Sequence, residues 1–484
     1  MKIGMISLGC PKNLVDSEVM LGLAQQAGHQ LTRDAAEADV LVVNTCAFID
    51  KAKQESIDAI LEMAEHKKQG RCKSLVVAGC MAERYRAELL EQIPEIDAVI
   101  GTGEVPRIVD LLGARDSGVD TRGPGFGIRD SKNGAQTVPL LRSNGEAIDM
   151  GGQVPAVMES AGLPTYIYDA DTPRLLATPR HYAYLKIAEG CDYKCAFCII
   201  PTLRGHYRSR TPQSILQEAR MLAAGGVKEL LLISQDTSFY GVDRGERGAL
   251  AHLLRSLNTV DGLEWIRMLY LYPTTIGDDV LEAMAESEKV CKYIDLPLQH
   301  ASDAVLKRMK RPGTRASYER LLARMRSRMP GVALRTTFIV GFPGETEEDF
   351  AELQAFVGEM QFDHLGVFTY SHEEGTSARS LPDDVPAQVK RRRQARLMAM
   401  QKKIVARAQA ARVGERVRVL VDGPSEEQEL VLRGRLETQA PDIDSLVYLT
   451  ECDVERVPSG AFLNAEIVGS RGYDLLARPL DYTT

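Results

Sequence analysis

Three cysteines at the spacing CxxxCxxC are the residues of this chain best suited to chemistry. Cys191, Cys195 and Cys198 fall within eight residues, so one loop can wrap all three thiolates around a single inorganic cluster. A 4Fe-4S cluster has four irons and usually four protein ligands. Three cysteines leave one iron open, and an open metal position is where chemistry can take place.

A second possible set of metal ligands consists of Cys10, Cys46 and Cys80, each at the end of a predicted strand. The strands, at 2–9, 39–45 and 74–79, are apolar runs followed by helical patterns, which indicates βα units in a parallel sheet. The carboxyl ends of parallel strands share one edge, where open α/β sheets place their ligands. We therefore expect the three thiols to converge on a second cluster. Three separate buried thiols are the alternative.

Length and composition indicate a multidomain protein of ordinary polarity. The chain of 484 residues is too long for one core and suggests about three domains. Its net charge of −8 argues against non-specific nucleic-acid binding and weakly favours a basic partner. We see no cleavable signal pattern and no apolar run that could span a membrane, so we expect a cytoplasmic protein. In a reducing compartment, nine cysteines favour metal ligands or buried thiols over disulfides.

The pattern changes twice after the first three strands. Residues 114–178 are rich in glycine and show no sustained period, which predicts a linker or an insertion. Residues 179–408 then alternate six strands with helical stretches, which predicts a partial (β/α)6 barrel. The six predicted strands are 181–188, 229–234, 265–271, 292–296, 334–340 and 365–370.

Polar residues or glycine follow several of these strands and predict a lined pocket at their carboxyl ends, the active face of βα barrels. The CxxxCxxC loop follows the first strand and should lie on that face. By position alone, we name Phe197, Gln235 and Gly341 as residues that could bind a cofactor; turn geometry is the alternative for Gly341. We predict no catalytic residue beyond the cluster ligands.

The C-terminal part of the chain differs in charge from the stretch before it. Residues 386–412 form a basic helical stretch that we interpret as a solvated connector, with a nucleic-acid contact as the less favoured alternative. Short alternating strands then predict a small antiparallel β-barrel over 412–480. Residues 412–484 hold 8 Lys and Arg against 14 Asp and Glu, a net charge of −6. Such a domain should repel phosphate backbones.

The CxxxCxxC motif, at the head of a six-strand pattern, resembles the radical S-adenosylmethionine superfamily, in which the open iron chelates the amino and carboxylate groups of that cofactor. The strand-end cysteines in SLGCPKN, NTCAF and AGCMAERY, with the acidic terminal barrel, are similar to the methylthiotransferases. That family combines an N-terminal domain carrying an auxiliary cluster, a radical core and a C-terminal TRAM domain. The resemblance implies these domains at 1–113, 179–408 and 412–480, joined by a linker, 114–178, that is long for the family.

Two longer motifs, SLGCPKNLVDSE and GRLETQAPDIDSLVY, resemble the branch of the family that methylthiolates an aspartate of the twelfth small-subunit ribosomal protein. The resemblance implies two 4Fe-4S clusters and S-adenosylmethionine. The cluster on Cys191, Cys195 and Cys198 would cleave S-adenosylmethionine to a radical that takes hydrogen from the aspartate β-carbon. The cluster on the strand-end cysteines would supply the methylthio group. The implied partners are a basic ribosomal protein, free or in the ribosome, and a low-potential electron donor such as flavodoxin or ferredoxin; direct RNA contact is not required.

Three other functions stay open on the residues alone. A transfer-RNA adenosine methylthiotransferase uses the same core, although we would expect it to carry a more basic terminal domain. A two-cluster electron carrier also needs six cysteines, but it needs neither a barrel nor a terminal recognition domain. A structural zinc protein fits poorly, because closed tetrahedral sites require a fourth ligand that neither cysteine set has nearby.

Overall fold

The computed structural model describes residues 1–116, 140–141, 147–148, 163–426 and 430–480. The predicted linker lies mostly outside these described residues, apart from the paired strands β6 (Leu140–Leu141) and β7 (Ala147–Ile148) and the stretch after residue 162. The chain divides into two compact units, each described by itself. Unit 1 comprises 1–177, 188–210 and 371–379, and unit 2 comprises 178–187, 211–370 and 380–484.

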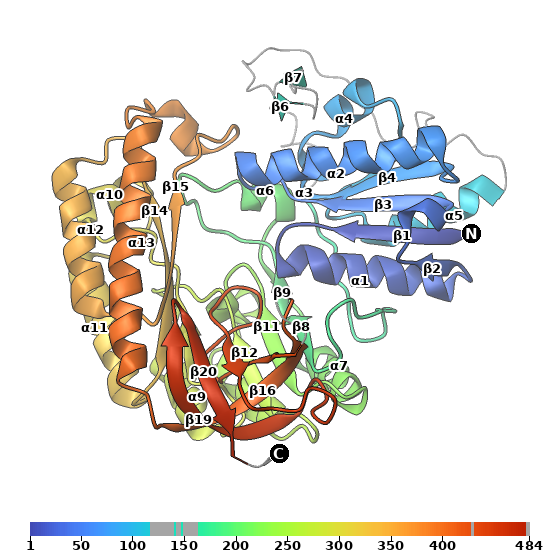
Figure 1. Cartoon of the computed structure of the whole chain (residues 1–484). Coiled ribbons are helices and arrows are strands. Elements are labelled where there is room, and N and C mark those ends of the chain that lie inside the picture. The colour runs from blue at the N-terminus through green and yellow to red at the C-terminus, as the bar shows by residue number, and fades with distance from the viewer. Residues whose placement is uncertain (117–139, 142–146, 149–162, 427–429, 481–484) are drawn as a thin grey trace. The chain divides into compact units, whose positions relative to one another are not determined.

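Unit 1 is built on a five-stranded parallel sheet with the order β2-β1-β3-β4-β5 (Figure 1). The three predicted strands are confirmed as β1, β3 and β4. The sequence does not predict β2, which has three incompletely buried residues, or β5, where an aspartate interrupts a short apolar run. The bounds are β1 (Lys2–Ser7), β2 (Gln30–Thr32), β3 (Val40–Thr45), β4 (Ser74–Gly79) and β5 (Ile96–Ile100).

The helices of unit 1 bury both faces of this sheet. One face, with Val43 and Val77, packs against Ile57 and Ile60 of α2, and Leu203 of α6 joins the same core. Burying these aliphatic side chains contributes ~1.5–3 kcal/mol each. Helix α1 packs against β1, β3 and α5. The bounds are α1 (Pro11–Gln26), α2 (Asp50–Gln69), α3 (Cys80–Arg84), α4 (Arg86–Gln92), α5 (Ile108–Asp116) and α6 (Ile200–Arg204), with the short antiparallel pair β9 (Ala188–Glu189) and β10 (Arg208–Ser209).

Unit 2 contains the six predicted parallel strands, in the sheets β12-β11-β8 and β13-β14-β15. A parallel bridge between Ile266 and Val290 and a hydrogen bond from the Leu271 N–H to the Asp295 carbonyl (2.9 Å) continue the first sheet into the second. The predicted partial barrel is therefore confirmed. The bounds are β8 (Tyr182–Lys186), β11 (Glu229–Ile233), β12 (Trp265–Met268), β13 (Tyr293–Asp295), β14 (Ala333–Val340) and β15 (His364–Thr369).

Helices alternate with these strands, and α11, α12 and α13 lie outside β14 and β15 (Figure 1). Helix α7 begins at Pro212, and Thr211 caps it by accepting a hydrogen bond from the Ser214 N–H (3.3 Å). The bounds are α7 (Pro212–Ala224), α8 (Ala249–Asn258), α9 (Asp278–Glu286), α10 (Asp303–Arg308), α11 (Arg315–Arg328), α12 (Glu347–Met360) and α13 (Ala387–Ala410).

The interpretation of residues 386–412 as a solvated connector is wrong, because one face of α13 is buried against β15. Several buried positions on this face are polar, so hydrophobic periodicity does not mark it. Gln401 donates to the Phe362 carbonyl (2.7 Å), and the buried Arg393 pairs with Glu345 (3.2 Å). Helix α13 is therefore part of the core of unit 2.

Unit 2 ends in a closed five-stranded barrel with the order β16-β17-β18-β20-β19. Four pairings are antiparallel, as predicted, and β18 pairs with β20 in parallel. The barrel encloses its own apolar core, which includes Val419, Leu432 and Ile467. The bounds are β16 (Arg416–Pro424), β17 (Leu432–Arg435), β18 (Val447–Leu449), β19 (Phe462–Arg471) and β20 (Asp474–Pro479).

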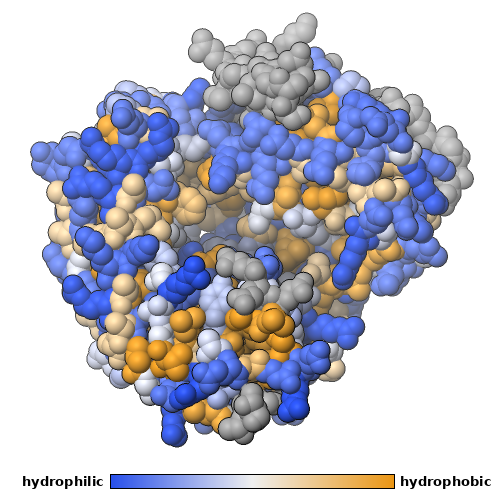
Figure 2. Space-filling model, viewed as in Figure 1, coloured by the Kyte–Doolittle hydropathy of each residue, from blue (hydrophilic) through white to orange (hydrophobic). Residues whose placement is uncertain are grey.

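The face in Figure 2 mixes hydrophilic residues with small apolar areas. The most exposed large apolar side chains among the described residues are Leu430, Met221 and Val413. Within the described ranges, no helix has the length and apolar character needed to cross a membrane.

Candidate metal centre

Cys10, Cys46 and Cys80 lie at the carboxyl ends of β1, β3 and β4, as the sequence predicts. Cys10 directly precedes α1, Cys46 follows β3, and Cys80 is the first residue of α3. Gly9 has a φ of +89°, and a Cβ there would lie 2.8 Å from the Cβ and 3.2 Å from the Sγ of Cys46. Glycine is therefore required where the strand turns into α1, and the side chain of Cys46 lies against the residue next to Cys10.

Asn13, from the SLGCPKN motif, connects the same three strand ends. Its buried Nδ2 donates to the carbonyls of Leu8 (3.1 Å) and Thr45 (2.7 Å), which lie beyond β1 and at the end of β3. Its Oδ1 lies 3.7 Å from the Sγ of Cys80 at the end of β4. One amide thus holds in register the loop ends that carry the three thiols.

The electrostatics of this trio suit a cationic cluster. Burial raises the pKa of Cys46 to about 11, and the neighbouring Cys10 thiolate adds to the shift. Burial also raises the pKa of Cys80 to about 12, where Arg204 opposes the shift and the other two cysteines add to it. The three thiols are thus near enough to repel one another as thiolates. Metal ligation deprotonates thiols and supplies the missing positive charge, so this donor set fits an iron–sulfur cluster.

The CxxxCxxC loop belongs to unit 1 as well and runs between β9 and α6. Cys191 donates its backbone N–H to the Gly205 carbonyl (3.0 Å), and Cys198 donates to the Cys195 carbonyl (3.1 Å). All three thiols are partly exposed. The loop therefore turns back on itself with its thiols accessible, as a cluster with one open iron requires.

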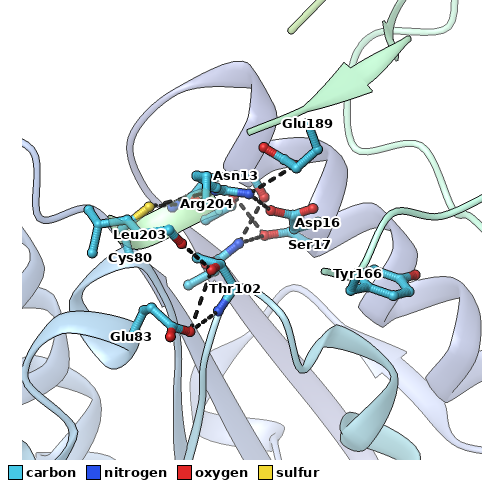
Figure 3. Close-up of polar contacts among 12 residues, drawn as sticks. Asn13, Asp16, Ser17, Cys80, Glu83, Thr102, Tyr166, Glu189, Leu203 and Arg204 are labelled. Carbon is cyan, nitrogen blue, oxygen red and sulfur yellow. Dashed lines mark hydrogen bonds and ion pairs between the residues drawn. The ribbon is translucent and has the colours of Figure 1, made fainter. Parts of the chain in front are cut away.

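Arg204, the last residue of α6, reaches from the helix after the cysteine loop to Cys80 of the strand-end trio (Figure 3). Its guanidinium pairs with Asp16 (2.6 Å) and Glu189 (3.2 Å), donates to Asn13 Oδ1, and lies 3.6 Å from the Sγ of Cys80. Thr102 fixes the same helix by donating its hydroxyl to the Leu203 carbonyl. The sequence predicts no role for Arg204, because its partners come from distant parts of the chain.

Glu373 is a second buried charge that the sequence does not mark as important. It lies in the 371–379 segment of unit 1 and pairs with Lys53 of α2 (2.9 Å) and Arg84 of α3 (3.1 Å). Arg84 also donates to the Ala47 carbonyl (3.0 Å), next to Cys46. In the same segment, Ala378 donates its N–H to the Ala196 carbonyl of the cysteine loop (2.8 Å). The segment therefore supports the backbone around both cysteine sets.

Of the three predicted cofactor residues, one lies in unit 1 and two lie in unit 2. Phe197 is partly buried in the cysteine loop of unit 1, and Gln235 follows β11 in unit 2. Gly341 follows β14 in unit 2 with a φ of +76°, and a Cβ there would clash with the side chain of Lys390. The Gly341 N–H donates to the Glu345 carboxylate. Turn geometry alone thus explains the glycine, and its N–H is already engaged.

Other potential metal ligands are not clustered. In the described parts of the chain, no three His, Cys, Asp or Glu side chains are arranged to hold a single metal ion. Cys72 and Cys291 are buried and Cys452 is partly buried, and all three lie outside the two cysteine sets. In a 4Fe-4S cluster each cysteine thiolate binds a different iron, so the three thiols of a set need not converge on one point.

Part of the acidity of the terminal barrel is used inside unit 2. Asp422 forms a bidentate pair with Arg435 of the same barrel (2.9 Å at each oxygen). Asp444, 1% exposed, pairs with Arg335 of β14 (3.3 Å) and accepts from the Tyr293 hydroxyl (2.7 Å). Two of the barrel's carboxylates, and its Arg435, are therefore paired inside unit 2 rather than available to a partner.

Three family models match the chain. Residues 2–101 match Uncharacterized protein family UPF0004, residues 185–357 match the Radical SAM superfamily, and residues 413–480 match the TRAM domain. The first range contains the strand-end cysteines, and the second contains the CxxxCxxC loop.

Relatives align along nearly the whole chain. The chain is 46% identical over 480 residues to a protein named ribosomal protein uS12 methylthiotransferase RimO from Trichlorobacter lovleyi, covering 99% of this chain and 98% of that protein. It is 47% identical to the protein of the same name from Koribacter versatilis, covering 99% and 96%. Among solved structures, the radical S-adenosylmethionine methyltransferase TsrM from Kitasatospora setae is similar in fold, with a TM-score of 0.53 and 17% identity over 76% of this chain and 74% of that one.

Proposed function

Because this chain belongs to the family of RimO ribosomal protein uS12 methylthiotransferases, we propose that it transfers a methylthio group to an aspartate β-carbon of ribosomal protein uS12. The observation that carries the proposal is this full-length similarity together with the two cysteine sets of unit 1. The enzyme is a radical S-adenosylmethionine methylthiotransferase whose cofactors are S-adenosylmethionine and two 4Fe-4S clusters. The reaction also needs a one-electron donor of low potential, such as flavodoxin or ferredoxin.

Each cysteine set has one role in this proposal. Cys191, Cys195 and Cys198 hold the cluster whose open iron binds S-adenosylmethionine, and Cys10, Cys46 and Cys80 hold the auxiliary cluster. When bound, the first cluster supplies the electron that cleaves S-adenosylmethionine, and the auxiliary cluster supplies the sulfur. Asn13 and Arg204 orient the strand ends around the auxiliary site, and Glu373 braces the adjacent backbone. The domain division of 1–113, 179–408 and 412–480 remains part of the proposal, and it is supported by the three matched ranges, each of which falls within one of these domains.

The substrate is a protein side chain rather than a nucleobase. The relatives named above carry the uS12 name, and the terminal barrel retains more acidic than basic residues. A basic ribosomal protein is electrostatically complementary to such a barrel, which favours encounter more than final affinity. A transfer-RNA methylthiotransferase would gain from the opposite charge.

The test uses anaerobically reconstituted full-length protein with S-adenosylmethionine and a chemical reductant. It is offered recombinant uS12 and, separately, transfer RNA that lacks methylthio groups. Mass spectrometry should find one methylthio group on a uS12 aspartate and none on the RNA. Modified RNA beside untouched uS12 would overturn the substrate assignment. As matched variants, Cys46→Ala should still cleave S-adenosylmethionine without methylthiolation, and Cys198→Ala should do neither.

A further inference from the structure

Arg204 connects the helix after the CxxxCxxC loop to Cys80 of the strand-end set, and both belong to unit 1. It ends α6, six positions beyond Cys198, and its side chain is 3% exposed. One guanidinium nitrogen lies 3.6 Å from the Sγ of Cys80, within hydrogen-bonding distance for sulfur. The next residue, Gly205, accepts the backbone N–H of Cys191. A short path therefore runs from the Cys80 sulfur through Arg204 to the backbone of the cysteine loop.

The surroundings of Arg204 keep it charged and fixed in place. Burial disfavours the cation, but the carboxylates of Asp16 (2.6 Å) and Glu189 (3.2 Å) pair with it and offset that cost. Asp16 and Glu189 hold one nitrogen, and Asn13 Oδ1 holds the nitrogen that faces Cys80. Because Asn13 donates its Nδ2 to two strand-end carbonyls, its Oδ1 is left to face Arg204. Figure 3 shows the guanidinium between these oxygens and the Cys80 sulfur.

We propose that Arg204 is a positioning residue that sets the reduction potential of the auxiliary cluster by donating an N–H to the Cys80 sulfur. This inference rests on the two-cluster function proposed above. Hydrogen bonds to ligand sulfurs and nearby positive charge stabilise the reduced, more negative form of a cluster. Since Arg204 ends the helix that directly follows the cysteine loop, the segment that holds the radical cluster also adjusts the cluster that delivers sulfur.

The experiment isolates the auxiliary cluster by using full-length protein in which Cys191, Cys195 and Cys198 are all replaced by alanine. Iron and sulfide are counted after anaerobic reconstitution, and the midpoint potential is measured by a redox titration monitored by electron paramagnetic resonance. In this background, Arg204→Gln should lower the ratio of reduced to oxidised cluster at least tenfold at a fixed potential, which is about 59 mV for one electron. Arg204→Lys keeps the charge but loses the planar fork, so its shift should be smaller and in the same direction.

Arg174→Gln is the matched control. Arg174 is also buried in unit 1 and pairs with Glu18 (2.6 Å) on the helix that carries Asp16. Its removal should leave the potential of the cluster unchanged. A wild-type potential in an iron-replete Arg204→Gln protein would overturn the proposal, as would an equal shift in Arg174→Gln.

Loss of the cluster itself has a distinct meaning. If Arg204→Gln does not retain iron, Arg204→Lys decides: a lowered potential supports the proposal, and the wild-type potential overturns it. If the triple-alanine parent binds no cluster at all, the two-cluster function fails before Arg204 is tested. Failure of the function and failure of the inference are therefore distinguishable.

Discussion

Arg204 in unit 1 and Arg435 in unit 2 are both buried arginines held by ion pairs. Arg204 lies near the carboxyl ends of the strands of its sheet, and Arg435 lies near the amino end of a strand in unit 2. Each is bound by two carboxylates: Asp16 and Glu189 hold Arg204, and Glu229 and Asp422 hold Arg435. Each joins segments that are distant in sequence. They differ in that Arg204 also has a cysteine sulfur within reach.

The location of each arginine explains that difference. Arg204 lies beside Cys80, at the carboxyl edge of a parallel sheet, where open α/β folds bind ligands. Arg435 lies on β17 of the terminal barrel and contacts Glu229, the first residue of β11. This contact is at the amino ends of the strands of the partial barrel, where residues contribute to stability. His181 pairs with Asp422 (2.9 Å), and Arg267 pairs with Glu229 (2.7 Å). Both therefore belong to the group of ion pairs around Arg435. The buried arginine at the carboxyl edge therefore reaches a candidate cluster ligand, whereas the one at the amino end joins the terminal barrel to β11.

The largest expected effect that separates the two arginines comes from Arg435→Met. This change leaves Glu229 and Asp422 without their shared cation, and breaking a buried ion pair on one side costs ~3–5 kcal/mol. Denaturant unfolding should show the unfolding free energy of unit 2 reduced by about that amount, while the iron content and cluster potentials stay at wild-type values. A shifted cluster potential would remove the contrast between the arginines.

Glu264→Gln provides the control for burial. Glu264 also reaches the terminal barrel, through Arg418 at 2.9 Å, but both side chains are more than a third exposed. Exposed pairs contribute ~0–1 kcal/mol, so this variant should unfold almost as the wild type does. If Glu264→Gln lowered the unfolding free energy as much as Arg435→Met does, any ion pair between the terminal barrel and the rest of unit 2 would stabilise the protein, whether or not its charges are buried.

A smaller effect should appear in how the unfolding free energy depends on pH, through the ion pairs around Arg435. Burial disfavours the ionised form of Asp422, but the hydrogen bond with His181 and the charge of Arg435 prevail and lower its pKa. Stability from this carboxylate is therefore present above about pH 4 and is lost as pH falls through the lowered pKa. Asp422→Asn should be less stable at neutral pH and lose less stability below pH ~4, the slopes differing by at most ~1.4 kcal/mol per pH unit. Parallel pH profiles of unfolding free energy would contradict this.

The sequence is sufficient to predict elements that carry a strong local signal. The strands before Cys10, Cys46 and Cys80 and the six strands of the partial barrel are all predicted from apolar runs. Strand β2 and the buried face of α13 are missed, because short edge strands and buried polar side chains lack that signal.

The positions of the candidate ligands are predictable, but their support is not. Convergence of strand ends follows from sheet topology, whereas the contacts of Arg204 with Asp16 and Cys80 join residues more than a hundred positions apart. Charge counting is incomplete for a related reason: Asp422 and Asp444 pair with arginines inside unit 2, and the count does not show which carboxylates face a partner. Local patterns locate the ligands, and only tertiary structure identifies what positions them.

The most direct test of the account is an iron and sulfide count on anaerobically reconstituted wild type, Cys46→Ala and Cys72→Ala. Two separate clusters predict that Cys46→Ala loses about half of the iron. Cys72 is buried and lies outside both cysteine sets, so Cys72→Ala should retain all of it. Unchanged iron in Cys46→Ala would contradict the second cluster and, with it, the role assigned to Arg204.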